Sequence, residues 1–399
     1  MNAGFSGPFR SISQHFSFTG APMFPPSVFF TSFFSVTPIL VGVNGMRRKM
    51  VENVNGILFG KFLPPHLGHL HCIETAFQNC SKLFIVVCTT KTSQPSGRDR
   101  AKWIQQLAPR AEVLLTDDLC EWHFGKPCVD RCSNTWATWL GQVIAEKIDV
   151  VFSSEEYGQN FAKLVDANHV SIDPGRVIFS VSGSQIRADW RKNWLDMPAV
   201  VRTGLFRKIV IVGSESSGTS TLASDLAAIM QAPLVAEVGR MISWELAIQN
   251  GGMGNVDWNE QVFWRVLRDQ ADAENIARFQ NCDLIPGEFG PWIVCDTDAV
   301  ATVVWWERYL SADSNSAWNF AETGLGDIYV VTDPSDVDFW QDGIRDGEHL
   351  RFEMHNSFLE VVERTKKAFV VARGSREERV QQILDVIRNL ETSVTQMCA

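Results

Sequence analysis

Residues 208–221 read KIVIVGSESSGTST, and this stretch decides the fold of the second half of the chain. An apolar run over Lys208–Val212 predicts a buried strand, and a helical pattern follows the loop to about Met230. Strand, glycine-rich loop and helix in this order are typical of a phosphate-binding loop, whose backbone amides surround phosphate oxygens. The residues expected to bind ATP there are Gly213, Glu215, Ser216, Ser217, Gly218, Thr219, Ser220 and Thr221.

The loop departs from the usual pattern at one position. GxxxxGK[ST] is matched at Gly213, Gly218 and Ser220, but Thr219 stands where the lysine belongs. That lysine normally bridges the β- and γ-phosphates. A charge-assisted hydrogen bond is typically worth about 1.5–3 kcal/mol, so its loss predicts slower phosphoryl transfer. Arg345, Arg351 and Lys208 are the candidates to replace the charge.

Carboxylates and a basic loop follow later strands of the same half. Asp296 and Asp298 come after the predicted strand Trp292–Cys295, where carboxylates suit a metal or a substrate hydroxyl. Ser220 and Asp296 are therefore the predicted Mg²⁺ ligands, and Asp296 is also a predicted catalytic residue. The stretch Asp342–Arg345 could form a lid from which Arg345 reaches the γ-phosphate. The alternative for Arg345 is an ordinary solvated loop residue.

A second chemical motif lies near the start of the chain. The predicted strand Gly56–Phe59 runs into GKFLPPHLGH at residues 60–69, and a helix follows. Ligands bind past the carboxyl ends of strands in open α/β sheets. His66 and His69 would stand at the first turn of the helix, where amides and imidazoles attract an anion. A pair of structural histidines on one helix is the alternative.

A later motif complements these histidines. Residues 180–187 read SVSGSQIR after a predicted strand over Arg176–Phe179. Ser182 or Ser184 can cap a helix, and Arg187 lies on the same end. Together HxGH and SxSxxR form a two-part polyphosphate clamp that resembles the nucleotidyltransferase family of adenylyl transfer enzymes. The resemblance implies that the ATP triphosphate lies between His66, His69, Ser184 and Arg187, and that a substrate phosphate attacks the α-phosphorus with Mg²⁺ assisting.

The rest of the sequence alternates predicted strands and helices, which indicates two α/β units with parallel sheets. The predicted fold is an N-terminal Rossmann-like nucleotidyltransferase domain followed by a P-loop kinase-like α/β domain. The expected division is a leader at 1–51, the first domain at 52–190, a linker at 191–207, the second domain at 208–392 and a tail at 393–399. The leader is interpreted as disordered or as preceding the true start at Met46.

Composition limits the function. The chain has 399 residues, 36 basic against 46 acidic, and a formal charge of −10. This balance argues against a nonspecific nucleic-acid or anionic-membrane binder. Nine cysteines without disulfide-like density indicate a reducing compartment. We expect a cytoplasmic enzyme that acts on small molecules, without nucleic-acid or membrane partners. The sequence leaves open whether it is a homo-oligomer.

Because they contain both the polyphosphate clamp and the phosphate-binding loop in this order, residues 52–390 resemble the NadR-type bifunctional proteins of NAD synthesis. Further matching segments are Gly60-Lys61-Phe62, Asp99-Arg100, Ser153–Glu156, Ile172-Asp173-Pro174 and Glu237-Val238-Gly239-Arg240. The resemblance implies nicotinamide-mononucleotide adenylyltransferase followed by ribosylnicotinamide kinase. Gly60, Lys61, Phe62, Ser182 and Ser184 would contact ATP, while Arg100, Trp136, Glu155 and Asp298 would contact the other substrates. The choice between nicotinamide and nicotinate stays open.

Three alternatives remain at this stage. The second domain could be a degenerate P-loop domain that senses nucleotide without kinase activity, because Thr219 replaces the lysine. Some members of the family repress transcription through an N-terminal helix-turn-helix, but residues 1–51 lack the helical apolar period and basic charge that this needs. Cys120, His123, Cys128 and Cys132 could bind Zn²⁺, although their spacing is not a standard pattern and free cysteines are commonly buried as small hydrophobes.

Overall fold

The computed structural model describes residues 53–89, 93–116, 129–155, 157–252, 256–310, 312–341 and 347–398, with side chains left out at 129–133 and 391–398. The leader, the predicted lid around Arg345 and most of the cysteine–histidine cluster lie outside these residues. The chain forms two compact units. Of the described residues, those within 53–62, 68–89 and 108–180 belong to the first, and those within 63–67, 93–107 and 181–398 to the second.

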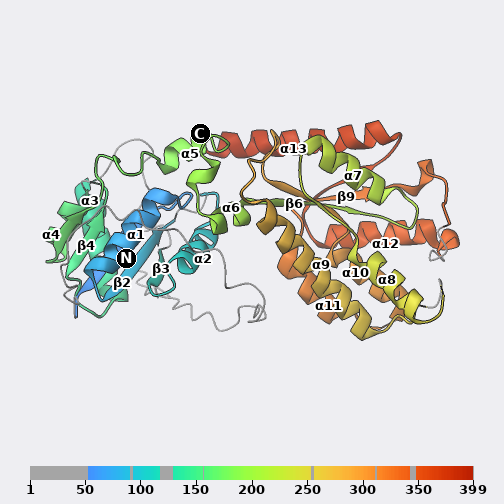
Figure 1. Ribbon diagram of the computed structural model, residues 1–399, viewed down its shortest axis with the longest axis horizontal. Coiled ribbons are helices and arrows are strands. Elements are labelled where there is room, and N and C mark those ends of the chain that lie inside the picture. Colours follow the sequence, from blue (N-terminus) through green and yellow to red (C-terminus); the bar gives the residue numbers. More distant parts are fainter. Residues whose placement is uncertain are drawn as a thin grey trace, which may run out of the picture. The chain divides into compact units, whose positions relative to one another are not determined.

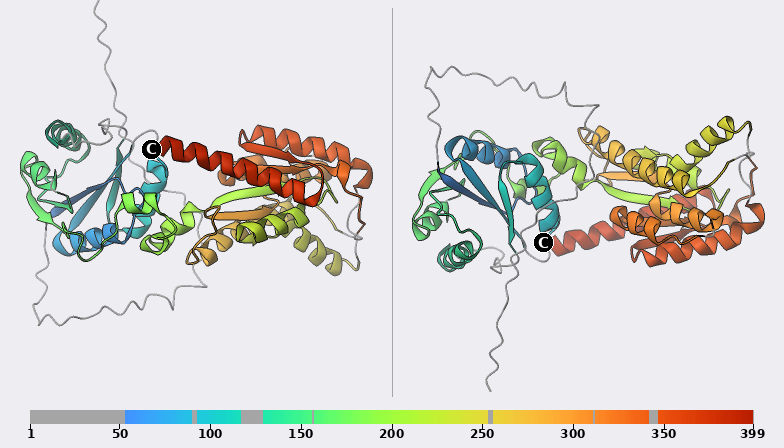
Figure 2. Two further views of the ribbon diagram at one scale, coloured as in Figure 1. Left: turned by 90° about the horizontal axis from the view of Figure 1, so that it is seen from above. Right: turned by 90° about the horizontal axis from the view of Figure 1, so that it is seen from below.

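The first unit contains a five-stranded parallel sheet in the order β3-β2-β1-β4-β5. Its strands are β1 (Asn55–Gly60), β2 (Lys82–Cys88), β3 (Glu112–Thr116), β4 (Val150–Ser153) and β5 (Asn168–Ser171). The order runs outward from β1 in both directions, so the loop after β1 stands at the switch point of the sheet, where ligands bind in such folds. Helix α1 (Leu67–Asn79) covers one face, while α3 (Val129–Val143) and α4 (Tyr157–Leu164) cover the other (Figure 2).

The second unit repeats this architecture with the order β10-β9-β6-β8-β7. All its strand pairs are parallel. The strands are β6 (Arg207–Val212), β7 (Leu234–Val235), β8 (Trp292–Asp296), β9 (Ile328–Thr332) and β10 (Ala368–Ala372). The central strand β6 leads directly into the phosphate-binding loop (Figure 1). The predicted fold class, two α/β units with parallel sheets, is confirmed.

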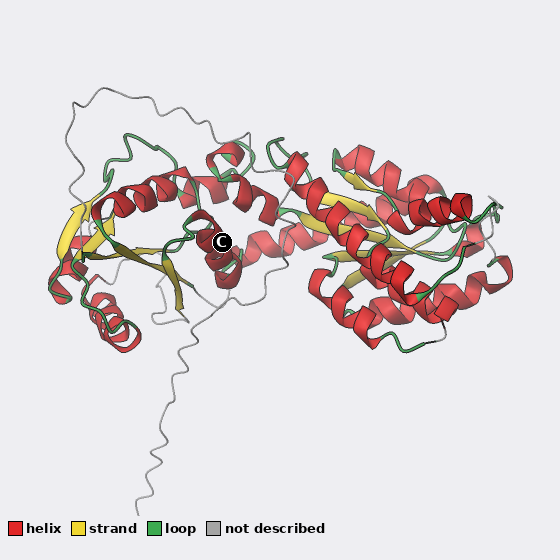
Figure 3. Cartoon of the chain, turned by 60° about the horizontal axis from the view of Figure 1, so that its bottom comes forward, coloured by secondary structure: helices red, strands yellow, loops and turns green. Residues whose placement is uncertain are grey.

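Helices enclose the second sheet on both faces (Figure 3). Side chains alternate along β6, so Ile209 and Ile211 enter one core while Val210 and Val212 enter the other. The first core packs against α7 (Thr219–Met230) and α13 (Arg376–Cys398). The second packs against α9 (Glu260–Asn281), α10 (Ala299–Leu310), α11 (Asn315–Ala321) and α12 (Arg351–Arg364). The strand is buried on both faces, which explains its uninterrupted apolar run.

One predicted strand is wrong. Residues 176–179 form no strand, and the fifth strand of the first sheet is β5 at 168–171. The Asp173 carboxylate accepts the backbone amides of Val177, Ile178 and Phe179 at 2.7–3.2 Å. These amides would otherwise donate to a neighbouring strand. Asp173 and Arg176 also have φ of 45° and 50°, a left-handed conformation that breaks an extended chain.

The segment predicted as a linker is ordered and packs within the second unit. It contains a 3₁₀ turn at Trp194–Asp196 and α6 (Ala199–Leu205), and Trp194 is buried. Trp194 Nε1 and Arg202 Nε both donate to the Cys282 carbonyl at 2.8 Å. The other helices are α2 (Gly97–Leu107), α5 (Gly183–Ala188) and α8 (Val238–Gln249). No helix in the described ranges has both the length and the apolar character needed to cross a bilayer.

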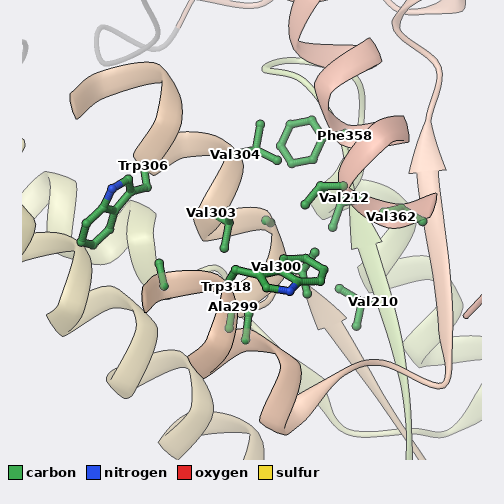
Figure 4. Close-up of a cluster of buried hydrophobic side chains, with 14 of the residues drawn as sticks. Val210, Val212, Ala299, Val300, Val303, Val304, Trp306, Trp318, Phe358 and Val362 are labelled. Carbon is green, nitrogen blue, oxygen red and sulfur yellow. The ribbon is translucent and has the colours of Figure 1, made fainter. Parts of the chain in front are cut away.

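The core of the second unit gives a stability prediction. Phe358 of α12 is fully buried beside Val304 and Val212 (Figure 4), whereas Phe352 of the same helix is 61% exposed. Phe358→Ala should destabilise this unit by about 3–5 kcal/mol, because it leaves a cavity in a packed core. Phe352→Ala should change its stability by less than about 0.5 kcal/mol. Denaturant unfolding of both variants measures this, and equal losses would contradict the assigned packing.

Candidate nucleotide-binding sites

The phosphate-binding loop is held tightly on the sheet. Ser217 Oγ lies 2.7 Å from the Ser214 carbonyl and 2.6 Å from Thr332 Oγ1 at the end of β9. A Cβ on Gly213 would lie 2.1 Å from Thr332 Oγ1 and 2.6 Å from Ser217 Oγ, so only glycine fits there. Gly218 has φ of 90°, a conformation that glycine adopts without strain, and α7 begins at the next residue. The predicted strand–loop–helix arrangement is confirmed in detail.

Asp296 ends β8 next to the first turn of α7. Burial raises its pKa, while hydrogen bonds from the Ser220 and Thr219 hydroxyls and the charge of Arg240 oppose the rise. Its Oδ1 is buried and accepts no hydrogen bond within the described structure. A buried carboxylate oxygen beside a serine hydroxyl has the donor chemistry that suits a hard cation. The two predicted metal ligands, Ser220 and Asp296, are therefore brought together.

Asp298 lies two residues further on but is engaged inside the protein. It is fully buried, and its Oδ1 caps α10 by accepting the amides of Val300 and Ala301. Its Oδ2 accepts from Tyr329 Oη at 2.9 Å and from Lys208 Nζ at 3.3 Å. These contacts give Asp298 a structural role, and nothing in its geometry supports the predicted contact with substrate.

The three candidates for the missing lysine charge have different positions. Lys208 is 2% exposed and its Nζ binds Glu274 at 2.8 Å and the Gly324 carbonyl at 2.6 Å. It stands five residues before Gly213, roughly 16 Å along the strand, so it cannot reach the loop. Arg351 donates to the Ser216 carbonyl of the loop at 3.1 Å. Arg345 lies outside the described residues.

Glu215 connects the loop with two other segments. Its Oε2 accepts the Gly347 amide at 2.8 Å, and its Oε1 lies 3.7 Å from Arg308 of α10. Gly347 is the first described residue after the predicted lid. Glu215 therefore holds Gly347 against the phosphate-binding loop, while Ser216 Oγ accepts the Trp340 amide at 2.7 Å.

The SxSxxR motif of the first site meets the loop that carries His66. Ser182 caps α5 by accepting the Gln185 amide at 3.2 Å, as predicted. Arg187 donates to the Leu63 carbonyl at 2.7 Å and lies 3.4 Å from Ser184 Oγ. A Cβ on Gly183 would approach the Leu63 carbonyl to 2.8 Å, so α5 lies directly against this loop. His66, three residues after Leu63, is buried.

The turn after β1 is shaped by an aromatic side chain. Phe62 has φ of 48°, is buried, and packs against the His69 ring with centroids 4.8 Å apart. A Cβ on Gly60 would lie 2.8 Å from the Phe62 ring, which explains the glycine. Lys61, between them, is exposed. Phe62 thus orients His69, and its buried ring is unsuited to the ATP contact implied for it.

The other predicted substrate residues are engaged locally. Arg100 is buried, and it donates to the Pro95 carbonyl at 3.0 Å and to Ser93 Oγ at 2.7 Å. Trp136 is a core residue whose ring meets Phe59 edge to face at 5.7 Å. Glu155 is half exposed and forms an ion pair with Arg176 at 2.8 Å. Only Glu155 has the exposure that a substrate contact requires.

Sequence reasoning missed several residues of the P-loop site. Three side chains contact the phosphate-binding loop from elements more than ninety positions away in the sequence. They are Thr332, Arg308 and Arg379. No local pattern marks them. Arg240 could have been found, because it ends the Glu-Val-Gly-Arg segment already noted. No group of three or more His, Cys, Asp or Glu side chains among the described residues could hold a metal ion, and the side chains of Cys120, His123, Cys128 and Cys132 lie outside this part.

Comparisons with known proteins agree with this geometry. A family model described as an AAA domain matches residues 208–379. The trifunctional NAD biosynthesis/regulator protein NadR of Escherichia coli K12 is 24% identical over 368 residues, which cover 87% of this chain and 85% of that protein. Its Salmonella typhimurium namesake is 28% identical over 219 residues, covering 50% of this chain and 52% of that protein.

Two solved structures share the fold along most of the chain. NadR in complex with NR, and NadR in complex with NAD and AMP-PNP, each superpose with a TM-score of 0.56 at 18% identity. Both matches cover 86% of this chain, with 97% and 98% of the respective structures. Fold and sites together define an α/β protein with a Rossmann-like domain followed by a P-loop domain. The chain is similar to NadR proteins over most of its length, in agreement with the resemblance of its motifs.

The closeness of Gly213 to Thr332 can be tested by substitution. Gly213→Ala should weaken ADP binding about tenfold or more, equivalent to about 1.4 kcal/mol per factor of ten, because the new Cβ displaces the loop. Gly324→Ala is the matched control, since a Cβ there meets nothing within 4 Å. Calorimetric titration with ADP gives both affinities. Unchanged binding by the Gly213 variant would refute the tight packing of the loop.

Proposed function

We propose that the chain makes NAD in two steps on its two nucleotide sites. The first site transfers AMP from ATP to nicotinamide mononucleotide, which releases pyrophosphate. The P-loop site phosphorylates nicotinamide riboside and so supplies that mononucleotide. The observation that carries the proposal is the hydrogen bond from Arg187 to the Leu63 carbonyl, because it joins the two halves of the polyphosphate clamp.

The residues of the first site suit adenylyl transfer without a protein nucleophile. Arg187 offers further N–H donors toward phosphate beside the Ser184 hydroxyl. His66 and His69 flank the start of α1, and the Phe62 ring packs against the ring of His69. These groups would hold the triphosphate and stabilise charge on the departing pyrophosphate, so that positioning and electrostatics carry the reaction.

The residues of the second site fit Mg²⁺ and a nucleoside triphosphate. Asp296 Oδ1 and Ser220 Oγ would hold the ion, and the buried carboxylate would gain a positive neighbour that lowers its raised pKa. Mg²⁺ commonly takes one or two protein ligands and fills its shell with water and phosphate oxygens. When bound, the ion would neutralise charge on the phosphates. Arg240, whose charge lowers the pKa of Asp296, would add positive charge close to the bound ion and phosphates.

A second function has one observation in its favour. Thr219 removes the loop lysine and Lys208 is committed to a buried ion pair, so the P-loop domain could bind nucleotide as a sensor without transferring phosphate. The intact glycines and hydroxyls of the loop favour the kinase. Cytoplasmic location and the absence of nucleic-acid partners also remain proposals. The five free cysteines among the described residues accord with the former.

Product analysis tests the main proposal. Full-length protein with MgATP and nicotinamide mononucleotide should yield NAD and pyrophosphate, and with the riboside it should yield the mononucleotide. Arg187→Ala should reduce NAD formation by 10²-fold or more, on the order of the loss of one preorganised charge-stabilising donor. Riboside phosphorylation by the same variant is the control and should be unchanged. If no NAD forms from the mononucleotide with the unaltered chain, adenylyl transfer is excluded.

Thr219→Lys separates the kinase from the sensor. If the domain is a kinase, the unaltered chain phosphorylates the riboside and the new ammonium group raises kcat by about tenfold or more, which corresponds to the 1.5–3 kcal/mol of a charged hydrogen bond. Ala228→Lys, at an exposed position nine residues further along α7, is the control for added charge. Phosphorylation that appears only in Thr219→Lys would instead establish the sensor.

A further inference from the structure

Two arginines from distant parts of the chain bind the backbone of the phosphate-binding loop. Arg379 of α13 donates from NH1 to the Ser217 carbonyl at 2.9 Å. Arg351, the first residue of α12, donates from NH2 to the Ser216 carbonyl at 3.1 Å. Two consecutive carbonyl groups of the loop are therefore held by guanidinium groups.

The same two side chains bind the loops that follow β9 and β10. Arg379 also donates from NH2 to the Asp333 carbonyl at 2.9 Å and from Nε to the Gly374 carbonyl at 3.0 Å. Arg351 also donates to the carbonyls of Pro334 and Val337 at 3.2 and 2.8 Å. Each guanidinium therefore joins the phosphate-binding loop to a neighbouring loop at the carboxyl edge of the sheet.

The geometry of the peptide group shows where the loop amides point when their neighbouring carbonyls are held by the two arginines. The carbonyl and the N–H of one trans peptide point in opposite directions. The Ser217 carbonyl points toward Arg379, so the Gly218 N–H points away from it. The preceding peptide has both groups fixed, because the Ser217 N–H donates to the Ser214 carbonyl at 3.2 Å. Gly218 itself has φ of 90°, and its ideal Cβ position lies 3.7 Å from Arg379 NH1.

The charge of Arg379 remains available to the loop. The side chain is only 4% exposed, and all the hydrogen bonds described for it go to backbone carbonyls and not to carboxylates. A guanidinium stays protonated at all relevant pH values. A buried positive charge next to Ser217 and Gly218 raises the electrostatic potential where phosphate oxygens would be bound, and solvent screens it only weakly.

We propose that Arg379 and Arg351 are positioning residues that compensate for the missing lysine of the phosphate-binding loop. The two side chains hold the Ser216 and Ser217 carbonyls away from the phosphates, and Arg379 in addition orients the Gly218 amide toward them and adds positive charge behind the loop. The ligand is the polyphosphate of a nucleoside di- or triphosphate. The inference rests on nucleotide binding at this loop, which is part of the proposed function, and not on riboside phosphorylation.

ADP titration of full-length variants in a magnesium buffer tests this inference. Arg379→Gln and Arg351→Gln should each weaken ADP binding by about tenfold or more, as expected for losing a charged hydrogen-bonding group. Arg376→Gln is the matched control, because this arginine stands one turn before Arg379 on α13, is exposed, and forms an ion pair with Asp225. Its affinity should stay within about twofold. The KM for MgATP should rise in the first two variants while that for the riboside is unchanged.

The outcomes separate this inference from the proposed function. If the unaltered chain binds no ADP, nucleotide binding at the loop is excluded and both proposals fall. If it binds ADP and the Arg379 and Arg351 variants bind equally well, only the positioning role is refuted, even where their thermal stability is lower. If Arg379→Gln no longer unfolds cooperatively, Arg351→Gln decides the result. Recovery of affinity in Arg379→Gln by adding Thr219→Lys would further support compensation.

Discussion

The contact of Gly213 and Ser217 with Thr332 is the constraint on which the P-loop site depends. Thr332 Oγ1 lies 2.6 Å from Ser217 Oγ and 3.3 Å from the Val212 carbonyl, so the hydroxyl at the end of β9 fixes both ends of the turn that leaves β6. This position follows from sheet register, since Val212 pairs with Val331. A shift of one residue would turn Thr332 to the opposite face and remove the contact. The apolar pattern of β6 and β9, which sets this register, thereby also determines the shape of the loop.

The sequence predicted those features that depend on neighbouring residues. The strand–loop–helix at 207–230, the Ser182 cap and the strands β1 and β8 follow from local apolar runs and turn residues. The segment 176–179 failed because Asp173, three residues earlier, takes up its amides. The two-residue strand β7 is too short for any periodicity. Local propensity cannot reveal the side-chain contact that replaces strand pairing at 176–179 or the short length of β7. Both are decided by the surrounding structure.

The site could be predicted less completely than the fold. Asp296 and Asp298 cannot be distinguished by their sequence context. Asp296 ends β8 beside Ser220, whereas Asp298 caps α10 and belongs to a buried ionic network. Neighbours in a strand–loop transition point in different directions, so spacing alone cannot separate a ligand from a cap. Arg379 could not be predicted from the sequence for another reason. It binds Ser217 across 162 positions of sequence, and no motif surrounds it. Residues of this kind become visible only when the loops are seen together.

The buried network around Lys208 shows why this lysine cannot replace the one absent from the loop. Burial lowers the pKa of Lys208, but Asp298 and Glu274 outweigh it and leave the pKa raised, so the ammonium stays charged. Burial has the opposite effect on a carboxyl group. It raises the pKa of Glu274, although the charge of Lys208 opposes this rise. Removing one member would leave an uncompensated charge in the core, typically at a cost of about 3–5 kcal/mol. The stability of the core therefore keeps Lys208 at the start of β6, the end of the strand that lies away from the phosphate-binding loop. Positive charge for the phosphate-binding loop must come from side chains that approach from outside the strand, and the arginines of α12 and α13 approach in this way.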